Sequence, residues 1–197
     1  MPGYKPVTYR APEGSEIAGG VIESFLEHLD QDVIDRFKFN RSAFDRSHWY
    51  PYQLFLDMAR DVTARGGSGV ETAIGKSLGQ DITRLFAITD LKYFIERGLT
   101  NTANIAFRNV PDGFGYVTTK LGYDHYHIKI QVPSPDYMVY GYVWEVSRQL
   151  CPKGVHFSLI VDREFGEGSK PGSFTIKWGP KVYVMNSSGA DKGEDAT

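Results

Sequence analysis

The fold class is decided by residues 114–161, which read FGYVTTKLGYDHYHIKIQVPSPDYMVYGYVWEVSRQLCPKGVHFSLIV. Apolar residues alternate over 114–121 and over 123–132, and this period of two predicts the two strands of a hairpin. Residues 134–150 begin with Ser-Pro and carry apolar residues at helical spacing, which predicts one long helix. Alternation returns over 155–161, so the stretch predicts two strands, a helix and another strand.

Outside this stretch, the helical and the extended patterns are segregated along the chain. Downstream, residues 173–178 alternate and predict the antiparallel partner of 155–161. Upstream, Arg65-Gly66-Gly67 predicts the end of a helix, and apolar residues recur at helical spacing over 17–29, 33–37, 54–62, 70–85 and 91–99. This order predicts an α+β fold, with N-terminal helices followed by an antiparallel sheet of two hairpins and a long helix between the hairpins.

Length and hydrophobic content are those of one domain. The chain has 197 residues, of which 41% are hydrophobic, and this is enough to bury a core. We expect residues 17–185 to form a single α+β domain of a ligand-binding type, in which 181–185 adds a short edge strand. Residues 1–16 are expected to be an N-terminal tail, and the small, polar and charged residues 186–197 a disordered tail.

Charge and composition exclude several classes of protein. The net charge of −2 lacks the cationic excess that is typical of nucleic-acid-binding domains, so we expect no nucleic acid partner. The sequence has no run of about 18 apolar residues and no secretory signal, so we expect no membrane span. Cys151 is the only cysteine, which excludes an intrachain disulfide and a cysteine-rich zinc site. These features together predict a cytoplasmic protein.

Several stretches resemble a known superfamily. Tyr140-Gly141-Tyr142-Val143-Trp144-Glu145 lies on the predicted long helix, Gly154 follows it, and Phe174-Thr175-Ile176-Lys177-Trp178 ends the second of two strands. With the order of elements, they resemble the ligand-binding domains shared by haem-nitric-oxide-binding sensors, four-vinyl-reductase-type domains and TRAPP vesicle-transport subunits. Trp49-Tyr50-Pro51-Tyr52-Gln53-Leu54-Phe55 also resembles a Trp-x-Pro stretch in a myxobacterial family of unknown function. The resemblance implies a fold that holds apolar small molecules or partner chains.

The chain departs from this superfamily at its cofactor sites. In haem-nitric-oxide-binding sensors, a His on the helix before the sheet holds the haem iron, and a Tyr-x-Ser-x-Arg stretch supports the haem propionates. Residues 90–110 contain no His, and the nearest counterpart of the second motif, Tyr142 to Arg148, has the wrong spacing. The several Cys that hold zinc in four-vinyl-reductase-type regulators are missing as well. We therefore do not expect haem bound by the usual His and Tyr-x-Ser-x-Arg pattern, and the identity of any cofactor stays open.

Six large aromatic residues are candidate ligand-binding residues, because the elements that carry them are expected to meet between the N-terminal helices and the sheet. They are Trp49, Tyr52, Phe55, Phe94, Tyr140 and Trp144. The alternative is that they fill the core, as aromatic residues at helical spacing commonly do. Gly141, which lies between two of them on the long helix, predicts a close approach of that helix to the sheet.

Three histidines form a candidate metal site. His125 and His127 are two residues apart on a predicted strand and so point to one face, and His156 lies on another strand of the same sheet. The alternative is an ordinary solvated surface, because the same face carries Lys129 and Gln131 and no carboxylate or Cys completes the usual ligand set.

The sequence favours binding over catalysis. It contains no Gly-x-Ser-x-Gly elbow, Walker loop or His-Glu-x-x-His motif. We expect a non-catalytic small-molecule-binding or sensory domain that holds an apolar ligand between the helices and the sheet. One alternative is a protein-interaction module that forms a homodimer or binds a partner protein through an exposed apolar face. A second is a haem- or metal-binding sensor that uses other His ligands, drawn from His28, His48, His125, His127 and His156.

Overall fold

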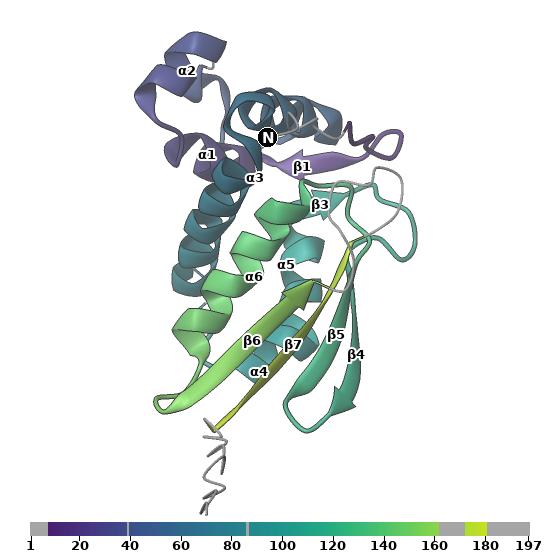
Figure 1. Ribbon diagram of the computed structural model, residues 1–197. Helices are drawn as coiled ribbons and strands as arrows, with labels where there is room; N and C mark the ends of the chain where they lie inside the picture. Colours follow the sequence, from purple (N-terminus) through teal and green to yellow (C-terminus); the bar gives the residue numbers. More distant parts are fainter. Residues whose placement is uncertain (1–7, 39, 86, 162–171, 181–197) are drawn as a thin grey trace, which may run out of the picture.

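The computed structural model describes residues 8–38, 40–85, 87–161 and 172–180. These residues form helices packed on a four-stranded antiparallel sheet, with a second, three-stranded sheet near the N-terminal helices (Figure 1). The predicted α+β fold class is therefore confirmed. Within these ranges, no helix is both long enough and apolar enough to cross a membrane.

The first half of the chain is mostly helical. β1 pairs antiparallel with both β2 and β3, and these strands of two or three residues are too short to leave a periodic signal in the sequence. In chain order the elements are β1 (Glu16–Ala18), α1 (Gly19–Glu27), α2 (Gln31–Phe37), a 3-10 turn (Arg41–Ala43), β2 (Trp49–Pro51), α3 (Tyr52–Leu85), α4 (Leu91–Tyr93), a π-helical turn (Phe94–Gly98), α5 (Leu99–Ala106) and β3 (Phe107–Arg108).

One helix boundary agrees with the prediction and one differs. α3 comprises the two predicted helices, and the kink between them lies at Gly67, whose φ of 64° and ψ of −167° are not helical, in agreement with the predicted helix end at Arg65-Gly66-Gly67. The last N-terminal helix was predicted to end near Leu99, but α5 continues to Ala106. Its inner residues Leu99, Ala103 and Ala106 are buried at helical spacing, and this packing outweighs the low helix propensity of the Asn and Thr residues between them.

The four-stranded sheet joins the two predicted hairpins. It consists of β4 (Tyr116–Gly122), β5 (His125–Ile130), β6 (Val155–Val161) and β7 (Ser173–Pro180), in the order β4-β5-β7-β6. β7 pairs with its hairpin partner β6 and also with β5, which makes one sheet. The buried residues of β5 and β7 are Tyr126, Ile128, Ile130, Phe174, Ile176 and Trp178. The predicted edge strand 181–185 and the tail 186–197 lie outside the described residues.

The long helix α6 (Asp136–Leu150) packs on the second half of α3 with the two backbones in contact. A Cβ atom at Gly75 would collide with the carbonyl group of Met138, and one at Gly141 with the carbonyl group of Thr72. The close approach at Gly141 is therefore to α3, and the prediction that it would be to the sheet was wrong. The reason is that α3 carries its own glycine opposite α6, so both partners lack the side chain that would separate them.

Gly141→Ala is expected to lower the free energy of unfolding by about 2 kcal/mol or more, because its methyl group would overpack this contact. Alanine raises helix propensity by about 1 kcal/mol, which is too little to compensate. The control is Gly69→Ala in α3, where a Cβ would meet no atom within 4 Å. For this variant we expect a small increase in the free energy of unfolding. Urea unfolding measures both variants. Similar effects of the two substitutions would contradict the backbone contact.

Candidate functional site

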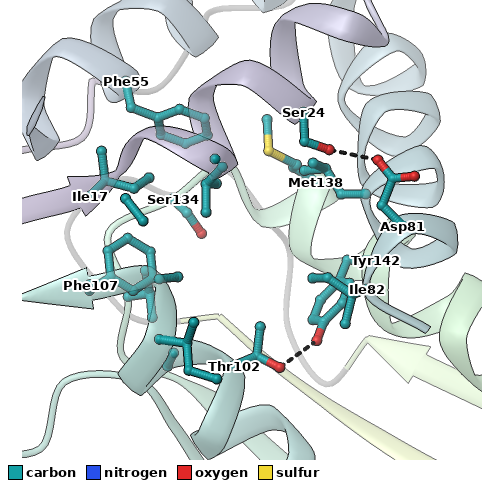
Figure 2. A pocket seen from close by; sticks show the side chains of 18 of the residues that line it. Ile17, Ser24, Phe55, Asp81, Ile82, Thr102, Phe107, Ser134, Met138 and Tyr142 are labelled. Atoms are coloured by element: carbon teal, nitrogen blue, oxygen red, sulfur yellow. Dashed lines mark hydrogen bonds between the residues drawn. The ribbon is translucent and has the colours of Figure 1, made fainter. Parts of the chain in front are cut away.

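A cavity of about 400 Å³ lies where β1, α1, α3, α5 and α6 meet (Figure 2). Its volume falls in the range of about 300–1,000 Å³ that is typical of small-molecule sites. The apolar lining includes Ile17, Ala18, Val21, Phe55, Leu78, Ile82, Ala103, Ile105, Ala106, Phe107, Val132, Met138 and Val139. The site therefore lies among the helices and against the three-stranded sheet, which contributes Ile17, Ala18 and Phe107. Among the described residues, Tyr116 of β4 is the one lining residue from the four-stranded sheet.

Each helix contributes residues that are three or four positions apart and therefore share one face. The pairs are Val21 and Ser24 on α1, Leu78 and Ile82 on α3, Thr102 and Ala106 on α5, and Met138 and Tyr142 on α6. The π-helical turn directly before α5 inserts one residue into the helical path, which changes the face that α5 presents. The shape of the cavity thus depends on which face each of the four helices turns toward it.

The mouth of the cavity is polar and is bridged by Asp81 of α3. Ser24 of α1 donates a hydrogen bond of 2.7 Å to Asp81 Oδ2, and His28 Nε2 lies 2.9 Å from the same oxygen. Because an ionised carboxylate can only accept hydrogen bonds, His28 Nε2 donates the hydrogen of this bond. Arg84 Nη2 donates to Asp81 Oδ1 at 2.9 Å. These bonds hold α1 against α3 beside the opening.

The partners of Asp81 determine its charge. Burial alone would raise its pKa, but the hydrogen bonds from Ser24 and His28 and the charges of His28 and Arg84 together hold the pKa below its usual value. Asp81 is therefore ionised at neutral pH. Arg46, a second cation at the opening, is paired with Glu23 and Glu27.

The inner wall is aromatic and neutral. The Tyr52 hydroxyl group donates to the carbonyl oxygen of Pro133 at 2.6 Å, and the Tyr52 ring meets Phe107 edge to face at 4.8 Å between centroids. Tyr142 meets Phe94 edge to face at 5.8 Å, and its hydroxyl group lies 3.5 Å from Thr102 Oγ1. Burial raises the pKa of Tyr52 and of Tyr142, so both are uncharged.

One hydroxyl group of the wall has no hydrogen-bond partner in the part of the chain that the structure describes. Ser134 lies between β5 and α6, is 7% exposed, and directs its hydroxyl oxygen toward the open centre of the cavity (Figure 2). Ser134 Oγ has no hydrogen-bond partner among the described residues.

The structure divides the six aromatic candidates into three groups. Tyr52 and Phe55 line the cavity, and Phe94 is fully buried behind Tyr142. The other three lie elsewhere: Trp49 is near Arg108, Trp144 packs on Phe157 of β6, and Tyr140 lines a shallow surface groove.

The three histidines of the candidate metal site are on the outer face of the sheet and are spread over it. His125 pairs with Lys177 of β7, and His156 of β6 pairs with Gly179, so β7 separates them. Within the described ranges, no three residues of the His, Cys, Asp and Glu types come together as a metal site would require.

Sequence reasoning missed most of the polar residues of the site. Ser24, His28 and Asp81 come together only through the packing of α1 on α3, and 53 residues separate His28 from Asp81. Thr102 and Ala106 were missed because α5 was predicted to end before them. For Ser134, the one signal in the sequence was its place between two prolines.

The fold is that of solved H-NOX proteins. H-NOX from K. algicida, in the Fe(II) unliganded state, superposes with a TM-score of 0.63 at 9% identity, over 86% of this chain and 100% of its own. H-NOX from S. oneidensis in the Fe(II)NO state superposes with a TM-score of 0.60 at 10% identity, over 83% of this chain and 99% of its own. The F78L variant of Tt H-NOX superposes with a TM-score of 0.62 at 10% identity, over 85% of this chain and 97% of its own. No family profile and no curated protein matches the sequence. The predicted resemblance to haem-nitric-oxide-binding domains is thus confirmed for the fold.

The donor atoms of the cavity do not fit a haem iron, although haem distortion in the H-NOX family is the subject of a further solved structure with this fold. Proteins hold haem iron with His, Cys thiolate, Met together with His, or Tyr. The described lining residues include no His or Cys, so Met138 has no His to act with. Burial raises the pKa of Tyr52, Tyr116 and Tyr142, which opposes the phenolate form that binds iron.

Asp81→Asn is expected to lower the free energy of unfolding at pH 7 by about 1–2 kcal/mol, because it weakens charge-assisted hydrogen bonds. The pKa of Asp81 is lowered by folding, so its contribution is complete above the unfolded value of about 3.9 and is lost as the pH falls through the folded value. The two proteins should therefore converge in acid. Urea unfolding at pH 7, 5, 4 and 3 tests this, and a constant difference would contradict it.

Proposed function

We propose that this chain is a small-molecule-binding, sensory domain that holds an apolar ligand, without haem, in the cavity between its helices and its three-stranded sheet. The observation that carries the proposal is the largely apolar cavity of about 400 Å³. It lies in a fold whose solved examples include H-NOX proteins described with Fe(II), with NO and with haem.

The size of the space supports binding over simple packing. Protein interiors are close-packed, with few voids larger than a water molecule. Here Phe55, Met138 and Tyr142 are almost fully buried and still border a space of ligand size. Filling it with an apolar molecule would restore the contacts that these side chains lack.

Access to the cavity is supported by the exposure of its rim. Ile105 on α5 is 52% exposed, and the side chains of Arg46 and Arg84 are 61% and 76% exposed. All three also line the cavity. A ligand would therefore enter between α1, the end of α3 and α5, past the hydrogen bonds of Asp81.

Ala106→Phe is expected to weaken the binding of N-phenyl-1-naphthylamine, an uncharged fluorescent probe, by about tenfold or more, which corresponds to about 1.4 kcal/mol. The added ring would fill part of the cavity from the α5 side. The matched control is Asn104→Phe, which adds the same ring at an exposed position of the same helix that does not line the cavity. Fluorescence titration with circular dichroism of each folded variant makes the comparison. Equal affinities would contradict binding in the cavity.

A second candidate function is self-association through the β4 edge of the four-stranded sheet. β4 and the turn after it expose Val117, Leu121 and Tyr123, which are 44%, 53% and 87% exposed. Exposed apolar side chains along an unpaired edge strand are typical of surfaces that associate. None of the three lines the cavity, so association here would be compatible with a bound ligand.

Native mass spectrometry with an absorbance spectrum of freshly purified protein tests both functions. We expect a bound small molecule that organic extraction removes, and no visible haem band. A Soret band would overturn the haem-free proposal. A dimer mass that Leu121→Ser reduces to a monomer would support association through the β4 edge.

A further inference from the structure

We propose that the ligand is uncharged and carries one hydroxyl or carbonyl oxygen that hydrogen-bonds with Ser134 inside the cavity. This inference rests on the proposed function and specifies the chemistry of its ligand. It comes from the one hydroxyl group of the wall that the described residues leave without a hydrogen-bond partner.

The unpartnered hydroxyl group is the first support. Ser134 is 93% buried, since 7% of it is exposed, and its oxygen points into the cavity (Figure 2). Buried polar groups in proteins are nearly always hydrogen-bonded, because an unmade bond in the interior is costly. Ser134 also precedes a helix, where a serine commonly caps the first turn. α6 has no side-chain capping bond, so capping does not account for this serine.

The hydroxyl group is held in a fixed place. Pro133 and Pro135 flank it, and proline restricts both its own φ angle and the conformation of the residue before it. The Tyr52 hydroxyl group anchors the segment further through its 2.6 Å bond to the carbonyl oxygen of Pro133. A preorganised donor of this kind loses little freedom when it binds a ligand atom.

The charges of the cavity favour an uncharged ligand. The lining cations are Arg46 and Arg84, whose side chains are more than half exposed, and both are already paired with carboxylates. Burying an anion beside Ser134 without a cation would be costly. A hydroxyl or carbonyl group, in contrast, needs only the single bond that Ser134 offers.

Three probes with the same ring system test the proposal: naphthalene, 1-naphthol and 1-naphthoate, which carry no polar group, a hydroxyl group and a carboxylate. In the wild-type protein at pH 7 we expect 1-naphthol to bind about fivefold more tightly than naphthalene, the usual effect of one hydrogen bond, and 1-naphthoate to bind most weakly. In Ser134→Ala, the affinity ratio of 1-naphthol to naphthalene should fall to about one. Tryptophan and probe fluorescence follow each titration.

The matched control is Ser147→Ala. Ser147 is also a buried serine of this region whose hydroxyl group has no described partner, but it does not line the cavity. Both alanine variants should be at least as stable as the wild type in thermal unfolding, and only Ser134→Ala should change the probe ratio. An unchanged ratio in Ser134→Ala, as expected if the hydroxyl group only holds a water molecule, would overturn the inference, as would tightest binding of 1-naphthoate. Failure of all three probes to bind the wild type would overturn the proposed function as well.

Discussion

The contact between α3 and α6 fixes the two cavity walls that these helices contribute. Gly75 and Gly79 of α3 face the backbone of Met138 and Tyr142 of α6. Met138 and Tyr142 also line the cavity, as do Leu78 and Asp81, which lie within two residues of Gly79 in the sequence. The close backbone contact therefore sets the separation of α3 and α6 at the level of the cavity. A larger side chain at the glycine positions would move α6 and the cavity wall with it.

The fold was predictable from the sequence to the extent that its elements are long. The alternation of residues 155–161 and 173–178 and the helical spacing of 136–150 each extend over enough residues to give a clear period. The short strands of the small sheet and the extension of α5 depend on tertiary packing, which propensity does not reveal. The same limit applied to the site: Tyr52 and Phe55 were identified as large aromatic residues on the correct helix, but Asp81 and Ser134 join the site only through residues distant in the sequence.

Polar groups are arranged differently at the two ends of the cavity. At the mouth, Asp81 accepts hydrogen bonds from Ser24, His28 and Arg84. These partners balance the negative charge of its carboxylate and hold the helices α1 and α3 together. Inside, Ser134 offers a hydroxyl group that the described protein atoms do not bond. Solved H-NOX proteins with this fold are described in Fe(II) states, yet here the wall offers neither His nor Cys among its described residues. A shared fold therefore leaves the ligand to be determined by a few side chains on its inner surface.

Stability and ligand binding are linked in such a site. An unfilled apolar space deprives Phe55, Met138 and Ala106 of contacts, and an unbonded Ser134 adds a further penalty, so the ligand-free protein has less than its attainable stability. A ligand that fills the space and bonds with Ser134 removes both deficits, and because it binds only the folded chain, it raises the free energy of unfolding in proportion to the logarithm of its concentration. The gain in stability would be greatest at the junction of α1, α3, α5 and α6. That junction adjoins the three-stranded sheet, and β1 and β3 both line the cavity, so a ligand that tightens the helices would also restrain these two strands.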